Sequence, residues 1–213
     1  MPTPSARLRL PISALILALA ACGGRTPPPD AVRAEPLMTA ALAGASVIVL
    51  PITMVVVEPG LPPSAGLANG AALVAWADSL VVEALAVRAP EVRWVLPAEL
   101  RRVARRAPGV AANPDQMGQA ILRQPSLNNV PDPLRSHLRT LMALAGGGRH
   151  AFVPAAVLLE SDLSGGVRAR IIAVLADGRS GAILWRTEAR GQGPDISVAL
   201  GRALATIFPI LQP

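Results

Sequence analysis

Apolar residues form separate blocks along the chain, and the first block lies near the N-terminus. Leu10–Ala20 is mostly apolar, and the basic residues Arg7 and Arg9 precede it. This block is shorter than the roughly 20 apolar residues that a membrane-spanning helix needs. A short apolar segment that follows basic residues and ends in small residues is typical of a secretory signal. We therefore predict that residues 1–21 are a signal peptide.

The apolar pattern beyond residue 43 alternates between strand-like and helix-like segments. Ser46–Val57 is a continuous β-branched run, which predicts a strand buried on both faces with a bulge or an exit at Pro51. The next segment has apolar residues at helical spacing, and Asp78 falls among the polar positions between them. The predicted strands are 46–57, 92–96, 150–159, 167–176 and 182–190, and the predicted helices are 67–88, 97–106, 114–122, 133–145 and 196–211.

Turn residues and capping residues mark the ends of these elements. Asn113, Asp132 and Asp195 each precede a predicted helix and are candidate N-caps. Gly146–Gly148 follows a helix and predicts its C-terminal cap. Asp177–Gly181 predicts a hairpin turn, and Gly191–Pro194 predicts the end of the last strand.

The order of elements predicts an α/β (α+β) fold, β-α-β-α-α-α-β-β-β-α. Helices that separate the early strands indicate a crossover connection, whereas the late strands form an antiparallel meander. We expect a mixed sheet of about five strands with helices packed on it, in a single periplasmic domain at 44–213. Proline and glycine are frequent in residues 22–43, which we predict to be the lipidated cysteine and a flexible tether.

Composition narrows the classes of function. Hydrophobic residues make up 52% of the chain and aromatic residues 2%, so the core must be built from Ala, Val and Leu. The net charge is +6, and it falls to +4 once Arg7 and Arg9 are removed with the signal. This modest charge and the lack of aromatic residues argue against nucleic-acid binding. Because Cys22 is the only cysteine, neither an intrachain disulfide nor a cysteine-based metal site can form.

The end of the signal segment resembles the lipobox of bacterial lipoproteins, on the residues Leu19-Ala20-Ala21-Cys22. The resemblance implies cleavage between Ala21 and Cys22. It also implies transfer of diacylglycerol to the Cys22 thiol and acylation of the new amine by a fatty acid such as palmitate. Gly23 follows the cysteine, which by similarity to enterobacterial sorting implies the outer membrane, facing the periplasm. The alternative is an ordinary signal peptide cut after Ala21, with an incidental cysteine.

Three segments and the order of the elements resemble a superfamily of bacterial envelope lipoproteins. The segments are Pro97–Val103, Leu144–Val153 and Asp177–Trp185, and the similarity covers most of residues 44–211. The superfamily includes the curli-secretion lipoprotein (the CsgG type), the outer-membrane activators of penicillin-binding proteins (the LpoB type) and the N-terminal domain of TolB. The resemblance implies their mixed α/β fold. The extra amphipathic strands that a curli-type pore needs do not stand out in this sequence.

Few residues carry candidate chemistry. His137 and His150 have no further metal ligand at suitable spacing, and Glu160 and Asp162 lie near turn residues, which indicates solvated charges. The sequence contains no nucleophile elbow and no phosphate-binding loop. We therefore predict no catalytic residue, no metal and no cofactor. The three tryptophans are expected in the core, namely Trp76, Trp94 and Trp185.

Four arginines form a basic patch on one short predicted helix, namely Arg101, Arg102, Arg105 and Arg106. One interpretation is a contact surface for anionic lipid or cell-wall polymer. The alternative is a solvated helix face, because the C-terminal turn of a helix favours cations.

The predicted anchor, tether and compact domain indicate a membrane-anchored, non-enzymatic adaptor or accessory subunit. We expect it to contact the membrane through its lipid and to bind an envelope protein of cell-wall synthesis or secretion. Two alternatives stay open. The first is a homo-oligomeric secretion or export component of the curli-secretion type, and the second is a hydrolase with a dispersed active site.

Overall fold

The computed structural model describes residues 34–61, 70–163 and 165–210, which belong to one compact unit. The predicted signal peptide, the cleavage site at Ala21 and Cys22, and the tether up to residue 33 lie outside the described residues. The fold below is therefore that of the domain alone.

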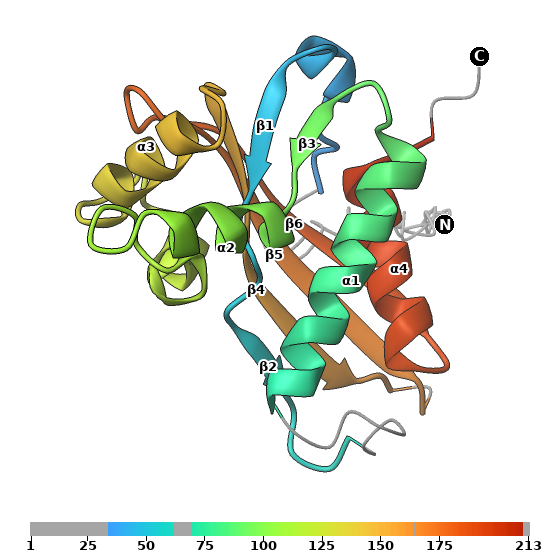
Figure 1. The fold of residues 1–213 in the computed structure, drawn as a ribbon. Coiled ribbons are helices and arrows are strands. Elements are labelled where there is room, and N and C mark those ends of the chain that lie inside the picture. The colour runs from blue at the N-terminus through green and yellow to red at the C-terminus, as the bar shows by residue number, and fades with distance from the viewer. Residues whose placement is uncertain (1–33, 62–69, 164, 211–213) are drawn as a thin grey trace, which may run out of the picture. The chain divides into compact units, whose positions relative to one another are not determined.

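A six-stranded mixed sheet forms the centre of the domain (Figure 1). Its strands are β1 (Ser46–Val49), β2 (Val55–Val57), β3 (Arg93–Val95), β4 (His150–Ser161), β5 (Val167–Asp177) and β6 (Ile183–Gly193). The order across the sheet is β3-β1-β4-β5-β6, and β2 also pairs with β4. The β1–β3, β1–β4 and β2–β4 pairs are parallel, whereas β4, β5 and β6 form an antiparallel meander. The expected α/β class and mixed sheet are confirmed.

Helices cover both faces of this sheet (Figure 1). They are α1 (Gly70–Arg88), α2 (Pro97–Arg106), α3 (Leu134–Leu144) and α4 (Ile196–Ile207). Three short 3-10 helices complete the set, at Thr39–Leu42, Pro114–Gln116 and Gln119–Arg123. Helices α1 and α4 lie side by side on one face, and α2 and α3 lie on the other. The segment 114–122, expected as one helix, is two 3-10 turns separated by Gly118, whose φ is +75°.

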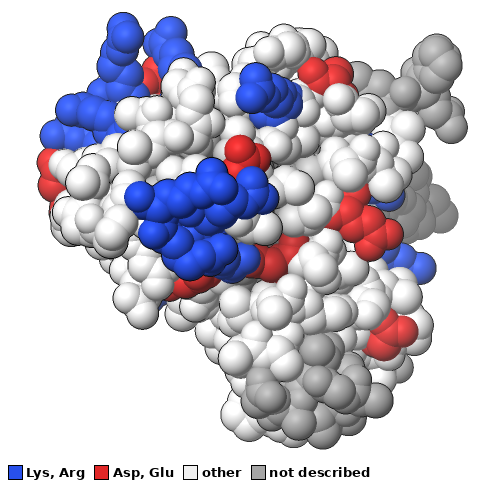
Figure 2. All heavy atoms as spheres, in the orientation of Figure 1, with Lys and Arg blue, Asp and Glu red and all other residues white. Residues whose placement is uncertain are grey.

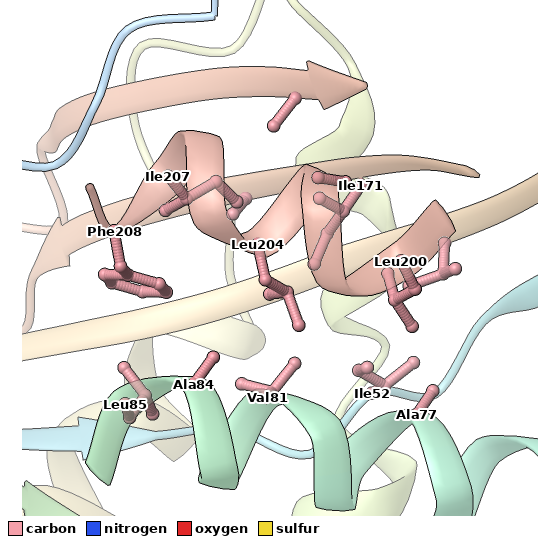
Figure 3. Close-up of a cluster of buried hydrophobic side chains, with 14 of the residues drawn as sticks. Ile52, Ala77, Val81, Ala84, Leu85, Ile171, Leu200, Leu204, Ile207 and Phe208 are labelled. Carbon is pink, nitrogen blue, oxygen red and sulfur yellow. The ribbon is translucent and has the colours of Figure 1, made fainter. Parts of the chain in front are cut away.

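The first core fills the space between the sheet and the helices α1 and α4 (Figure 3). Ala77, Val81 and Ala84 point from α1 toward Leu200 and Leu204 of α4. These side chains are small or branched, as the composition requires, so the two helices approach closely. An aromatic cluster closes one end, where the ring centroids of Trp94 and Phe152, and of Phe152 and Phe208, are 6.2 and 5.5 Å apart.

The second core lies on the opposite face of the sheet. Leu100 of α2 and Leu138 and Leu141 of α3 are fully buried there against the strands β1, β4 and β5. Burying a leucine side chain contributes about 1.5–3 kcal/mol, so this core fixes both helices on the sheet. Helix α2 is therefore held through one face and presents its other face to solvent.

The expected single strand at 46–57 is two strands that pair with the same neighbour. β1 and β2 both run parallel to β4, and residues 50–54 between them leave the ladder. Leu50 still donates its N–H to the Phe152 carbonyl, and the Met54 carbonyl accepts from Val157. Pro51 has no N–H to donate, which explains the interruption at this point. The structure thus places a break where a bulge or an exit was expected.

The last strand ends at Gly193, within the expected segment Gly191–Pro194 but three residues later than the expected residue 190. A Cβ added to Gly191 would lie 2.1 Å from the Ala199 carbonyl oxygen, and one added to Gly193 would lie 2.8 Å from the Ala199 nitrogen. These two glycines therefore allow the backbone of α4 to approach the strand closely. They serve as close-approach sites and not as strand breakers.

The described end of the predicted tether packs on the domain. Leu37 and Leu42 are both 5% exposed and belong to the first core. The Leu37 N–H donates to the carbonyl of Ile207 at the end of α4 (2.9 Å). Residues 37–42 are therefore part of the folded domain, which begins before residue 44.

Candidate functional site

The four arginines of the predicted basic patch lie on α2, but they do not form one uniform surface. Pro97 occupies the first turn of this helix, where its missing N–H costs no hydrogen bond, and Leu100 anchors the buried side. Arg102, Arg105 and Arg106 are exposed, whereas Arg101 is half-buried. Figure 2 shows arginines gathered over α2 as one basic patch.

Arg101 is held by two carboxylates. Its Nε and Nη2 donate to the carboxylate of Asp115 at 2.7–3.1 Å, and Nη2 also donates to Oδ2 of Asp78 at 2.9 Å. The hydrogen bonds to Asp115, followed by those to Asp78, raise the pKa of Arg101 above its ordinary value. Arg101 is therefore a structural cation, and the part of the patch open to a partner is reduced to three arginines.

Asp78 is buried, although its position in the sequence indicated the polar side of α1. Its residue is 7% exposed, and its Oδ1 accepts the backbone N–H of Ile52 at 2.6 Å. Burial raises the pKa of Asp78, and the hydrogen bonds from Ile52 and Arg101 oppose that rise. Asp78 thus connects the break between β1 and β2 to the arginine of α2.

Gln119 connects to the same break from the other side. Its side chain is fully buried, and Nε2 donates to the carbonyls of Pro51 and Pro114, both at 3.0 Å. Together with Asp78 it satisfies backbone groups of residues 51 and 52 that have left the ladder. Sequence reasoning missed this network, because its members are far apart along the chain and Asp78 falls among the polar positions of its helix.

The arginine surface, defined as Arg102, Arg105 and Arg106, has no ion-pair partner among the described residues. Helical geometry places positions three and four residues apart on one side of the helix, so these guanidinium groups face the same volume. A groove of about 320 Å³ lies between α2 and residues 111–115, and Arg105 is the member of the arginine surface that lines it. Planar guanidinium donors are suited to carboxylates or phosphates of a binding partner.

The two carboxylates considered for catalysis are bound to different arginines. Glu160 lies within β4 and accepts from Arg170 at 3.2 Å, and Asp162 accepts from Arg168 at 2.6 Å. The side chain of Asp162 is 13% exposed, so the expected solvated loop charges are ion-paired instead. Both ion pairs follow from the antiparallel pairing of β4 and β5 across the turn between them.

The histidines and tryptophans occupy different environments. His137 and His150 are half-buried, and the described residues contain no cluster of three metal-ligating side chains. Trp94 and Trp185 are half-buried against the first core, as is Trp76. Trp94 donates its indole N–H to the Ala89 carbonyl at 2.9 Å. The tryptophans therefore fill the core margin, as expected from the sequence.

No protein-family model matches this chain, and no curated protein matches it significantly. Several solved structures are similar in fold. The C-terminal domain of LpoB from Salmonella enterica is 14% identical, with a TM-score of 0.40 over 71% of this chain and 84% of that chain. Lipoprotein GNA1162 from Neisseria meningitidis is 17% identical, with a TM-score of 0.34 over 70% and 81%.

The PelC dodecamer from Paraburkholderia phytofirmans is also similar, at 15% identity and a TM-score of 0.39 over 84% of this chain and 95% of that chain. Because all three TM-scores are below 0.5, the resemblance of the sequence to the envelope-lipoprotein superfamily, its LpoB type included, stays a prediction. Because all three identities are below 25%, no partner or activity is transferred from these proteins.

Proposed function

We propose that this chain is a lipid-anchored, non-enzymatic adaptor of the cell envelope that binds an acidic surface of another envelope protein through the arginine surface of α2. The observation that carries the proposal is the difference in ion pairing among the arginines of that helix. Arg101 is neutralised by Asp78 and Asp115, whereas Arg102, Arg105 and Arg106 have no carboxylate partner among the described residues. A rigid helix with uncompensated cations is suited to recognition of a charged partner.

Exposed ion pairs are weak, so a partner must contact more than the three arginines. Exposed ion pairs contribute only about 0–1 kcal/mol each, so three arginines would steer and orient the complex more than hold it. The partner would also have to enter the groove beside Arg105, lined by Ala104 and Ala111, to bury apolar area. The proposed interaction therefore weakens with salt and depends on a narrow region of α2.

The membrane anchor is the second part of the proposal, and it rests on the lipobox at Cys22. We place the acylated cysteine in the outer membrane, with the domain facing the periplasm. Labelling of cells with radioactive palmitate, followed by membrane separation, tests it. The wild-type chain should carry label and fractionate with the outer membrane, and Cys22→Ser should lose the label. Label retained in Cys22→Ser would contradict the anchor.

The docking surface is tested by crosslinking the full-length chain in its native envelope and identifying what co-purifies by mass spectrometry. The test variant is Arg102→Glu with Arg105→Glu, and the matched control is Arg93→Glu with Arg123→Glu. Arg93 and Arg123 are also exposed and have no ion pair among the described residues. Wild type and control should recover the same dominant partner, and the α2 variant should recover it at least about tenfold less.

Two results would contradict this docking surface. Equal recovery by the α2 variant and the control would show that the arginines make no contact. Equal loss in both would indicate a general dependence on net charge. Melting curves of both variants must first match that of the wild type, because a glutamate near a helix C-terminus itself costs about 0.3–1 kcal/mol.

A homo-oligomeric export component is the second candidate, and α1 is the observation that favours it. Three apolar residues of this helix face solvent, namely Ala75, Ala86 and Val87, beside the exposed polar residues Ser79 and Glu83. Such exposed apolar area could pack against a second copy of the chain. Light scattering of the full-length chain in detergent tests this candidate. A concentration-independent monomer would exclude it.

A further inference from the structure

A second arginine cluster surrounds a groove at the C-terminal end of α3. The groove has a volume of about 380 Å³ and lies between the end of α3, the glycine turn after it and the turn between β5 and β6. Its lining residues are Arg139, Met142, Ala143, Gly147, Gly148, Arg149, Gly178 and Arg179. Figure 2 shows further arginines near the α3 side of the domain, separate from the α2 patch.

Hydrogen bonds make the walls of this groove rigid. The Gly147 N–H donates to the Met142 carbonyl and closes the turn after α3 (2.8 Å). On the other wall, Oδ1 of Asp177 accepts the N–H groups of Arg179 and Ser180 at 2.8 and 3.0 Å. The two walls touch at Gly178, where an added Cβ would lie 2.0 Å from Sδ of Met142. The groove is thus a preformed feature of the fold.

The three arginines around the groove keep most of their donors free. Arg149 uses Nε for Oδ2 of Asp177 at 2.7 Å, and its side chain is 71% exposed. Arg139 uses Nη2 for the carbonyl of Arg179 at 2.9 Å. Each guanidinium carries five N–H donors, so these two bonds leave the greater part available to a ligand.

The charge of the groove is unbalanced. No acidic residue is among its lining residues, and the nearby carboxylate of Asp177 is 2% exposed and already bound on both oxygens. Two other grooves on the described residues carry both signs, with Asp115 beside Arg101 and with Glu83 beside Arg88. The groove at α3 is therefore a site of positive potential with an apolar floor from Met142 and Ala143.

We propose that this groove binds a phosphate group, either free or as the headgroup of a phospholipid. Guanidinium groups bind phosphate oxygens in a planar, bidentate manner, and three of them at one opening can satisfy a doubly charged anion. Arg149 is oriented by Asp177, and Arg139 is oriented by its bond to the backbone carbonyl of Arg179, so these two side chains lose little freedom on binding.

The C-terminus of α3 is the feature that opposes an anion here, since helix C-termini carry partial negative charge. Its last turn is capped, however. The carbonyls of Leu141 and Met142 accept the N–H groups of Ala145 and Gly147, both at 2.8 Å. These bonds satisfy carbonyl groups that would otherwise face the ligand. With the Arg149–Asp177 ion pair counted, Arg139 and Arg179 leave the groove with a net positive charge, which outweighs the remaining partial charge.

Calorimetric titration of the full chain with inorganic phosphate tests the proposal, and sn-glycerol 3-phosphate provides a second arm. The test variant is Arg139→Gln with Arg179→Gln, which leaves the Arg149–Asp177 bond intact. The matched control is Arg93→Gln with Arg123→Gln, two exposed arginines that line neither this groove nor the one beside α2. Wild type and control should bind phosphate saturably, and the test variant should bind at least about tenfold more weakly. Melting curves confirm that each variant is folded.

The two arms separate the sources of the phosphate. Tighter binding of sn-glycerol 3-phosphate than of phosphate supports a phospholipid headgroup, and the reverse order supports a free anion. Absence of saturable binding by the wild type overturns the proposal. Equal affinity of the folded test variant and the wild type overturns it as well, because phosphate would then bind elsewhere.

Discussion

The carboxylate of Asp78 accepts the backbone N–H of Ile52 at 2.6 Å, across 26 positions of the chain. Ile52 lies where the chain leaves the ladder between β1 and β2, so its N–H has no partner in the sheet. A side chain from α1 thus replaces a strand–strand hydrogen bond. The same carboxylate binds Arg101, which links the sheet, α1 and α2 at one point.

Replacing Asp78 should separate its two roles. Asp78→Asn keeps an oxygen acceptor for Ile52 and loses the charge opposite Arg101, which we expect to cost about 1 kcal/mol. Asp78→Ala leaves the buried N–H of Ile52 unsatisfied and should cost about 2–3 kcal/mol. Urea unfolding of both variants measures the difference. Equal losses would show that the hydrogen bond to Ile52 does not contribute.

The ionisation of Asp177 should make the free energy of unfolding depend on pH in the acid range. Hydrogen bonds from the Ser180 and Arg179 N–H groups and from Arg149 hold the pKa of its carboxyl below the ordinary 3.8. A depressed folded-state pKa contributes stability above the unfolded value, and this is lost as the pH falls below about 4. The difference in unfolding free energy between wild type and Asp177→Asn should therefore be greatest near neutral pH and shrink toward pH 2.

The change of unfolding free energy with pH that Asp177 causes can be separated from the change that Asp78 causes, which has the opposite sign. Burial raises the pKa of Asp78, so its contribution falls as the pH rises through that raised value. Both the wild type and Asp177→Asn retain Asp78, and its effect cancels in their difference. A difference that stays constant between pH 7 and pH 2 would contradict the assigned role of Asp177.

Two glycines of the α4 region should respond in opposite ways to alanine. In Gly191→Ala the new Cβ would lie 2.1 Å from the Ala199 carbonyl, and backbone must move, so we expect a loss of about 2–3 kcal/mol. Gly201→Ala, in the middle of α4, meets nothing within 4 Å and should gain about 0.5–1 kcal/mol. Thermal unfolding monitored by circular dichroism checks both, and a tolerated Gly191→Ala would contradict the close approach.

Arg186 should hold the 3-10 segment to β6. Its guanidinium donates to the carbonyls of Leu122 and Leu127, the latter at 2.9 Å, and burial lowers its pKa. Arg186→Met leaves both carbonyls unpaired and should cost about 1–2 kcal/mol. Hydrogen exchange in residues 123–128 should also accelerate. The control Arg190→Met, on the same strand, removes an exposed ion pair with Glu188 and should change stability by less than about 1 kcal/mol.

Local signals in the sequence located most elements and two of the three predicted N-caps. Asn113 accepts the N–H of Asp115 at 3.1 Å, and Asp195 accepts that of Val198 at 2.9 Å, so these two N-caps are confirmed. The prediction for Asp132 is wrong, because Pro133 is the N-cap residue of α3 and no side chain caps this helix. Capping depends on residues two or three positions apart, which a pattern can reveal. The meander of the last three strands was predictable for the same reason, because its turns are short.

The features that escaped prediction depend on contacts between distant segments. Gly191 resembles a strand breaker in sequence, and only the proximity of α4 explains it. In the sequence Asp78 resembles a surface residue. Only the structure shows that it accepts the N–H of Ile52, which has no partner in the sheet. The four arginines do lie on α2. The neutralisation of Arg101 by Asp115, however, depends on where the 3-10 turn that carries Asp115 packs, and no sequence periodicity reveals this.

The separation of contacts along the chain has a consequence for the order in which the domain assembles. The strands β4, β5 and β6 pair with one another across short turns, and α4 follows β6 directly. By contrast, Val47 pairs with Trp94 and with His150, both far from it along the chain. Closing such long loops loses more entropy than forming a hairpin. We therefore expect β4, β5, β6 and α4 to fold early, and β1 to join the sheet last.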